Sequence, residues 1–459
     1  MGTRFQELPS LTQDLKVTLQ CSSTVFPLEE TESRSLFLSN IDQVLNFNVE
    51  TIHFFPANPD FPPEVVAEKI KAAFQKALIP YDFLAGRLRL DPHKGRLVID
   101  CNAAGAGFKV ARSEVSLADI GDLVYPNPAF EQLIMGSSDN LEPHNQPLCF
   151  LQVTSFKCGG LALGISTNHV TFDGISFKHF LENLASLAAD KALAITPCNN
   201  RQLLTARSPP RVMFPHPELV KFEIPPQGEE SYATTLFEAI AEDLEFKVFR
   251  LRPDDISGLK EKAKLGGSNN NGTSTRISIS SFNVVTAHVW RCRALAGDIG
   301  GDQEKKTSTL LYAVDIRSRL SPPLPPSYAG NGVVVTYARA TVGELKGASF
   351  PSIVEMVSEG AARMTDEYIR SIIDCGEVSK RFPHGDLLIS SWWKLGFSRV
   401  EYPWGRPKYS CPVVRHRKNI IVFFPDIEET DSGDGVNILV ALPFKEMEKF
   451  QALFNNFLA

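Results

Sequence analysis

The stretch Gly160-Leu-Ala-Leu-Gly-Ile-Ser-Thr-Asn-His169-Val-Thr-Phe-Asp173-Gly174 decides how the rest of the chain is interpreted. Residues 161–166 are mostly apolar and follow a Gly-Gly turn, which predicts a buried strand. After Asp173-Gly174, apolar residues recur at helical spacing as far as residue 187, which predicts a helix. The sequence therefore places a single histidine between the end of a strand and the start of a helix.

A histidine in this position can act as a general base. Its unperturbed pKa allows proton abstraction near neutral pH. The alternative is structural, because a lone histidine beside an apolar strand is ordinarily a packed core or loop residue. Asp173 has a structural alternative as well, since an aspartate just before a helix is an ordinary N-cap. The local sequence leaves these alternatives open.

Length and composition indicate a globular protein of two domains. The chain has 459 residues, too many for one ordinary core. Its net charge of -6 and the lack of a long basic run speak against a nucleic-acid surface. No stretch approaches the roughly 18–20 apolar residues of a membrane span, and the N-terminus lacks the apolar core of a signal peptide. We therefore expect a cytoplasmic protein without a membrane span.

Cysteine and histidine usage argues against a metal site. The eight cysteines include no C-x-x-C pair, and no Cys/His cluster or H-E-x-x-H motif is present. We expect reduced thiols that are mostly buried.

Strands and helices are expected in both halves of the chain. Helical patterns cover 63–78, 254–265, a segment starting at 280 and 352–373; strand patterns cover 48–55, 96–100, 150–156, 245–251, 308–314, 386–391, 420–424 and 436–442. Between the halves, residues 208–228 hold six prolines and can be neither helix nor central strand. The sequence predicts an α/β protein with domains at 1–200 and 228–459 and a crossover at 201–227.

Two motifs resemble a known family. The spacing His-x-x-x-Asp-Gly at residues 169–174 resembles the motif of CoA-dependent acyltransferases. Residues 397–405, Phe-Ser-Arg-Val-Glu-Tyr-Pro-Trp-Gly, resemble the Asp-Phe-Gly-Trp-Gly motif of the plant BAHD acyltransferases. Here Glu401, Tyr402 and Pro403 stand where Asp, Phe and Gly are usual.

Four further segments resemble the same family in the right order. They are 82–88, 287–291, 314–326 and 328–331. The resemblance covers nearly the whole chain and is greatest to the hydroxycinnamoyl-transferring branch. It implies a chloramphenicol-acetyltransferase-like fold, with two similar-sized α/β domains whose mixed sheets are flanked by helices. It also implies a monomer, an active-site channel at the domain interface, and a short segment near 382–408 that the first domain borrows from the second half.

The resemblance implies roles for particular residues. His169 would be the general base, worth roughly 10²–10⁴-fold in rate. The thioester oxygen becomes negative in the tetrahedral intermediate and needs hydrogen-bond donors. The indole N–H of Trp404 and the hydroxyl of Ser390 are the candidates for this role. Trp404 can instead be a packed aromatic residue beside Pro403.

Other motif residues are expected to be structural. The resemblance implies that Asp173 pairs with Arg317 or Arg319 and holds the loop that presents His169. Gly174, Glu401 and Gly405 are assigned to the same class.

The CoA phosphates need cationic or N–H donors. Ser280, Ser281 and nearby Arg276 are the candidates, with an ordinary helix N-cap as the alternative.

The implied function is transfer of a hydroxycinnamoyl group from a CoA thioester to an alcohol in plant phenylpropanoid metabolism. Acyl-CoA is a co-substrate, and no permanently bound cofactor is expected. No cysteine falls in either motif, so direct attack without an acyl-enzyme suffices. A lipophilic alcohol is the favoured acceptor, and a monolignol, a shikimate-like acid or an amine stays open. The alternatives are an acyl-CoA thioesterase and a non-catalytic ligand-binding relative.

Overall fold

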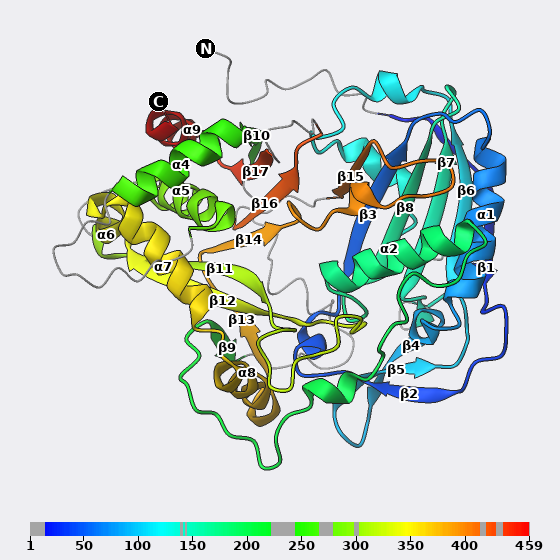
Figure 1. Cartoon of the computed structure of the whole chain (residues 1–459), viewed down its shortest axis with the longest axis horizontal. Helices are drawn as coiled ribbons and strands as arrows, with labels where there is room; N and C mark the ends of the chain where they lie inside the picture. Colours follow the sequence, from blue (N-terminus) through cyan, green and yellow to red (C-terminus); the bar gives the residue numbers. More distant parts are fainter. Residues whose placement is uncertain are drawn as a thin grey trace.

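The computed structural model describes residues 14–137, 141–142, 145–221, 244–265, 279–297, 303–413, 419–427 and 435–458. In these residues the chain forms two six-stranded mixed sheets that lie side by side, each with helices packed on it (Figure 1). The predicted two-part α/β fold is therefore confirmed.

The first sheet has the strand order β1-β6-β7-β8-β3-β15. Its strands are β1 (Val17–Val25), β3 (Asn48–Phe55), β6 (Ala106–Ser113), β7 (Cys149–Ser155), β8 (Leu161–Asn168) and β15 (Tyr409–Pro412). β7 and β8 form the predicted antiparallel hairpin, and β8 also pairs with β3, with Asn48 opposite Asn168 and Phe55 opposite Leu161. β8 is central in the sheet and buried along almost its whole length, as its apolar run predicts.

Two helices cover this sheet. They are α1 (Pro63–Ala77), which begins at a proline, and α2 (Gly174–Ala188), which is capped by Asp173. The apolar stripe of α2 predicted from its spacing is buried, including Phe177, Phe180, Leu181 and Leu184. A small sheet of β2 (Arg34–Phe37), β5 (Arg96–Cys101) and β4 (Arg87–Asp91) lies beside this half.

The second sheet has the strand order β10-β17-β16-β14-β11-β12. Its strands are β10 (Glu245–Leu251), β11 (Thr307–Asp315), β12 (Val333–Thr341), β14 (Leu387–Ser391), β16 (Ile420–Pro425) and β17 (Val436–Leu442). Its helices are α4 (Pro253–Leu265), α5 (Ser281–Ala296), α6 (Val342–Gly347), α7 (Phe350–Ala362), α8 (Asp366–Val378) and α9 (Phe444–Leu458). β9 (Leu219–Lys221) and β13 (Arg381–Pro383) form a separate two-stranded ribbon.

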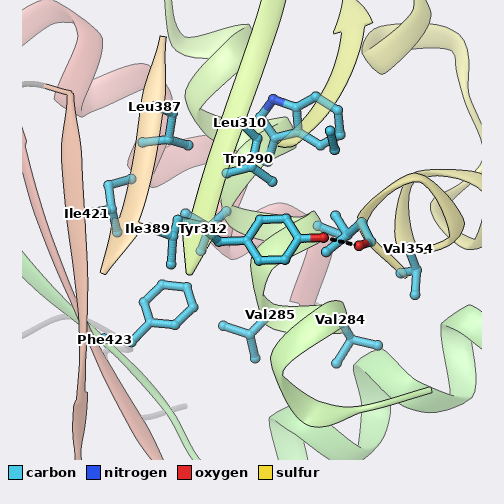
Figure 2. Close-up of a cluster of buried hydrophobic side chains, with 14 of the residues drawn as sticks. Val284, Val285, Trp290, Leu310, Tyr312, Val354, Leu387, Ile389, Ile421 and Phe423 are labelled. Carbon is cyan, nitrogen blue, oxygen red and sulfur yellow. Dashed lines mark hydrogen bonds between the residues drawn. The ribbon is translucent and has the colours of Figure 1, made fainter. Parts of the chain in front are cut away.

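The core of the second half lies between its sheet and helices α5 and α7. Figure 2 shows Val284, Val285 and Trp290 of α5 against Leu310 and Tyr312 of β11. Two aromatic residues of this core have their polar atoms paired: the Trp290 indole donates to Ser308, and the Tyr312 hydroxyl donates to the carbonyl of Val357 (Figure 2). The core therefore combines apolar burial with hydrogen-bonded aromatic residues.

One strand crosses between the halves. β15 comes from the C-terminal half but pairs with β3 of the first sheet, and Figure 1 shows it beside β3. Within the predicted crossing segment 382–408, β14 belongs to the second sheet. The strand that joins the first sheet begins only at Tyr409. Except for β15, the first sheet draws its strands from before residue 201, and the second sheet draws its strands from after residue 227. We therefore propose the predicted division into two domains, with β15 in place of residues 382–408 as the strand that crosses to the first domain.

One element was predicted wrongly. The single helix expected over 352–373 is two helices, α7 and α8, separated by three residues. The helical run is interrupted at Thr365, which caps the start of α8. Its side chain accepts a hydrogen bond from the amide of Tyr368. Asp366 and Glu367 then stabilise the first turn of α8 through the helix dipole.

Candidate active site

His169 follows the last residue of β8 and lies at the junction of the two halves. Its backbone N–H donates to the carbonyl of Phe47 at 2.8 Å, and its carbonyl accepts from Nδ2 of Asn331 at 2.9 Å. The ring of Phe47 meets the imidazole edge-on, with 5.2 Å between centroids. The imidazole is half-buried, and its Nδ1 has no hydrogen-bond partner among the described residues. The main chain of His169 is therefore held from both halves.

Burial lowers the pKa of the His169 imidazole below its ordinary value. The carbonyl of His169 itself, the charge of Asp173, the side chain of Asn331 and the charge of Asp42 oppose this effect without overcoming it. The ring is thus neutral near pH 7, which is the form that can accept a proton.

The carboxylate of Asp173 is fully engaged in structural contacts. Oδ1 accepts from the amide of Ser176 at 2.8 Å and from Arg317 at 3.0 Å. Oδ2 accepts from the amide of Gly332 at 2.7 Å and forms an ion pair with Arg317 at 2.8 Å. Arg319 instead donates to two backbone carbonyls at the end of α7, those of Ala361 and Met364. Of the two arginines proposed for the pair, the structure therefore joins Asp173 to Arg317.

Gly174 allows a close approach between α2 and the loop that follows β14. A Cβ at this position would lie 2.6 Å from Cδ1 of Leu395. A side chain here would force the side chain of Leu395 to move.

Trp404 is not brought to His169. Its ring packs against Phe55, Phe61 and Tyr402, with centroids 6.0, 6.4 and 5.2 Å away. Phe55 ends β3, whereas His169 lies beyond the start of β3, so roughly 20 Å of strand separates the two sites. The oxyanion role expected of Trp404 therefore has no geometric support, and its packing alternative describes what is observed.

The turn around Trp404 explains the other motif residues. Tyr402 and Gly405 exchange backbone hydrogen bonds, and Gly405 has a φ of 111°, a conformation that favours glycine. Glu401 pairs with Arg406 at the surface, where an ion pair contributes little. Replacement of the family's Asp-Phe-Gly by Glu-Tyr-Pro thus falls on a tight turn remote from the histidine.

Ser390 lies near the end of β14, shortly before Leu395 and Phe397, which pack on α2. Its Oγ accepts from the indole of Trp392 at 3.3 Å, so its own hydroxyl hydrogen is free to donate elsewhere. Trp392 in turn packs edge-on against Phe397, and Phe397 packs against Phe177 of α2.

The CoA-binding candidates are only partly described. Ser280 caps α5, where its side chain accepts from the amide of Asn283 at 3.0 Å, as its structural alternative predicts. Ser281 is the first residue of this helix. Arg276 lies outside the described residues. A CoA-binding role for these residues stays a prediction.

Three buried residues next to His169 had no role assigned from the sequence. Asn331 was noted only as part of segment 328–331, and Asp42 and Arg201 were not singled out. Asp42 and Arg201 form an ion pair at 3.2 Å with both side chains 0% exposed. The available signal was an aspartate set between the apolar residues Ile41 and Val44, because buried charges require partners.

Comparison with known proteins decides the family. The Transferase family model matches residues 15–456, nearly the whole chain. The chain is 56% identical to Acyltransferase GLAUCE of Arabidopsis thaliana, over 99% of both proteins. The chain belongs to the plant BAHD acyltransferase family. As a member of that family it is an acyltransferase that uses acyl-CoA as co-substrate.

Other similar BAHD acyltransferases carry more specific names. The chain is 34% identical to omega-hydroxypalmitate O-feruloyl transferase of Arabidopsis thaliana, over 96% of this chain and 93% of that protein. It is 31% identical to shikimate O-hydroxycinnamoyltransferase of Nicotiana tabacum, over 96% and 100%.

A solved structure supports the fold. Vinorine synthase superposes with a TM-score of 0.71 at 22% identity and covers 95% of this chain and 96% of that one. The chain and vinorine synthase therefore share the two-domain fold that the sequence predicted.

Across the described ranges no helix is long and apolar enough to cross a bilayer. Within the same residues, no group of three or more His, Cys, Asp or Glu side chains is placed to hold a metal ion.

Proposed function

We propose that this protein transfers a hydroxycinnamoyl group from its CoA thioester to the hydroxyl of a lipophilic alcohol, with His169 as general base. The observation that carries the proposal is the placement of His169. A neutral imidazole, kept neutral by burial, lies at the junction of the two halves and follows a central strand. Its main chain is fixed, and the ring stays partly exposed.

The proposed reaction is a direct displacement. Nε2 of His169 takes the proton of the acceptor hydroxyl while that oxygen bonds to the thioester carbon. The tetrahedral intermediate collapses as the C–S bond breaks, and the proton passes from Nε2 to the sulfur of CoA. Ester and free CoA leave, and the histidine is regenerated neutral.

No acyl-enzyme is included in this scheme. Cys411, the cysteine nearest the second motif, is buried, and burial raises its pKa to about 12. A thiol with such a pKa is protonated at neutral pH and is a poor nucleophile.

Ser390 is proposed as a donor to the oxyanion. Its hydroxyl accepts from Trp392, so its own hydrogen can be offered to the developing negative charge. Trp404 is left out of this role because it packs at the other end of β3.

Similarity to named relatives supports the donor and acceptor classes. Omega-hydroxypalmitate O-feruloyl transferase is 34% identical, and fatty alcohol:caffeoyl-CoA acyltransferase is 33% identical. Both names combine a hydroxycinnamoyl group with a long-chain hydroxyl compound. A relative named as an N-hydroxycinnamoyltransferase, at 30% identity, makes an amine the acceptor to test beside them.

The test is acyl transfer by the purified protein. Feruloyl-CoA and caffeoyl-CoA are supplied with 16-hydroxypalmitate, hexadecanol, shikimate or 5-hydroxyanthranilate, or without acceptor. Release of CoA is followed, and products are identified by mass. We expect ester formation with the long-chain hydroxyl compounds and a loss of about 10²–10⁴-fold in His169→Ala. His93→Ala, on the exposed turn between β4 and β5, is the matched control.

The other outcomes of this assay indicate a different reaction or contradict the proposal. CoA release without acceptor indicates a thioesterase, and product formation only with 5-hydroxyanthranilate indicates amide synthesis. Full activity in His169→Ala overturns the proposed base. No release by the wild-type protein from either donor overturns the hydroxycinnamoyl assignment.

A further inference from the structure

A general base must be oriented as well as neutral. For His169 to accept a proton at Nε2, its Nδ1 must carry the hydrogen and its ring must face the acceptor. In many enzymes a carboxylate bonded to Nδ1 sets this orientation. Here the carboxylate of Asp173 is used by Arg317 and two backbone amides, so another group must position the ring.

Asn331 is in contact with His169 and is completely buried. Its Nδ2 donates two hydrogen bonds, one to the carbonyl of His169 at 2.9 Å and one to Oδ1 of Asp42 at 2.8 Å. Both hydrogens of the amide are therefore used. Its Oδ1 and the Nδ1 of His169 are both buried and have no hydrogen-bond partner among the described residues. The side chain of Asn331 and the carbonyl of His169 itself are also among the influences that raise the pKa of the ring.

Asn331 is fixed by two buried charged residues. Asp42 accepts from the backbone N–H and hydroxyl of Ser39 through Oδ2. Its Oδ1 accepts from Asn331 and forms an ion pair with Arg201. Arg201 donates to the carbonyl of Ala329, two residues before Asn331. The amide of Asn331 therefore has little freedom to move.

The same arginine also holds the turn after His169. Nη1 and Nη2 of Arg201 donate to the carbonyls of Val170 and Thr171 at 3.0 and 2.8 Å. A Cβ at Gly330 would lie 2.6 Å from Nε of Arg201, so the backbone before Asn331 lies directly on the guanidinium. One buried cation thus joins the histidine turn to the segment that carries Asn331.

We propose that Asn331, held by Asp42 and Arg201, is the positioning residue of His169. This inference rests on the proposed function of His169 as the base. Asn331 fixes the carbonyl of residue 169 through Nδ2, and it presents Oδ1 toward the Nδ1–H of the imidazolium that forms when Nε2 takes the acceptor's proton. The charged pair acts through Asn331 and the turn, and it does not contact substrate.

The test compares two buried asparagines. Asn331→Ala removes the proposed positioning contacts. Asn183→Ala is the control, because Asn183 is equally buried and its Nδ2 also donates twice, to Tyr81 at 2.8 Å and to Ile195 at 2.7 Å, away from His169. Asp42 and Arg201 are not the first choice for substitution, because removal of either leaves the other buried without a counter-charge.

Turnover is measured with feruloyl-CoA and 16-hydroxypalmitate and is expressed per CoA-binding site, determined by titration with free CoA. We expect kcat of Asn331→Ala to fall about 100-fold, the cost of misplacing a catalytic group by about 1 Å, with KM for feruloyl-CoA changed by less than about 3-fold. Asn183→Ala should keep kcat within about 3-fold of wild type, even where both variants lose similar thermal stability. Equal kcat in the two variants overturns the proposal.

A double variant distinguishes positioning from a general structural effect. If Asn331 acts only through His169, adding Asn331→Ala to His169→Ala causes no further loss of the residual rate. A further loss of about 100-fold in that background means that Asn331 acts independently of His169 and overturns the inference. Failure of the proposed function looks different, because His169→Ala itself would then keep its activity.

Discussion

The protonation state of His169 is set by burial, and this sets the pH dependence of the reaction. The pKa of the ring lies below its ordinary value of 6.5, because desolvation outweighs the nearby carboxylates Asp173 and Asp42. Arg201 and Arg317 balance these two carboxylates through direct ion pairs. In the proposed mechanism the neutral ring is the active base. We therefore expect kcat/KM to be constant near pH 7 and to fall, on acidification, through a limb with a midpoint below 6.5.

The measurement is kcat/KM between pH 4.5 and 8 with two different acceptors. A limb that keeps its position with both acceptors belongs to the enzyme, and the residual rate of His169→Ala should lack it. A midpoint above 6.5 would mean that the carboxylates dominate over burial, contrary to the contacts described.

At the scale of the element, one ion pair holds the start of α2. Asp173 caps this helix and pairs with Arg317, and both side chains are buried. We expect Arg317→Ala to lower the free energy of unfolding by about 3–5 kcal/mol, because Asp173 is left as an uncompensated buried charge. Arg319→Ala removes hydrogen bonds to backbone carbonyls and should cost only about 1–3 kcal/mol.

Urea unfolding of the two variants measures this difference, and CoA release reports its effect on the site. Arg317→Ala should also lose acyl transfer, since α2 begins only six residues after Asn168, the last residue of the strand that precedes His169. Equal losses in the two variants would show that Arg319 shares the role of holding α2.

Local signals predicted the element that carries the histidine. The apolar run ending at residue 166 is β8, and the spacing after Gly174 is α2. The cap at Thr365 was missed because the helical pattern continues across it, although Thr-Asp-Glu is an ordinary N-terminal signal.

Contacts between distant residues could not be predicted in the same way. Asn331 meets His169 across 162 positions, and no local periodicity encodes such a pair. Trp404 could be placed in a motif but not at one end of β3, because its position depends on the pairing of β15 with β3. Sequence patterns therefore pointed to the proposed base, whereas its proposed positioning residue needed the fold.

At the scale of the whole molecule, the crossing strand joins the two halves through a buried histidine. His53 of β3 shares a hydrogen bond of 2.8 Å with Ser410 of β15, and it contacts Thr51 at 3.3 Å. Its ring also lies near Phe177 of α2 and near Phe397, which lies between β14 and β15. One side chain thus touches the first sheet, its helix and the strand borrowed from the second half.

This site makes the assembled molecule sensitive to acid. Burial lowers the pKa of His53 from 6.5 to about 3. Between these values the unfolded chain binds a proton that the native protein does not, so the native state loses stability as pH falls from 6.5 towards 3. The slope is at most about 1.4 kcal/mol per pH unit, which amounts to about 2 kcal/mol at pH 5.

Urea midpoints of wild type and His53→Gln, taken at pH 7.5 and pH 5, should differ in their acid dependence by this amount. His93→Gln, on the exposed turn between β4 and β5, should keep the wild-type dependence. An unchanged dependence in His53→Gln would mean that His53 is protonated in the native state and that the crossing strand tolerates a charge at its junction with the first sheet.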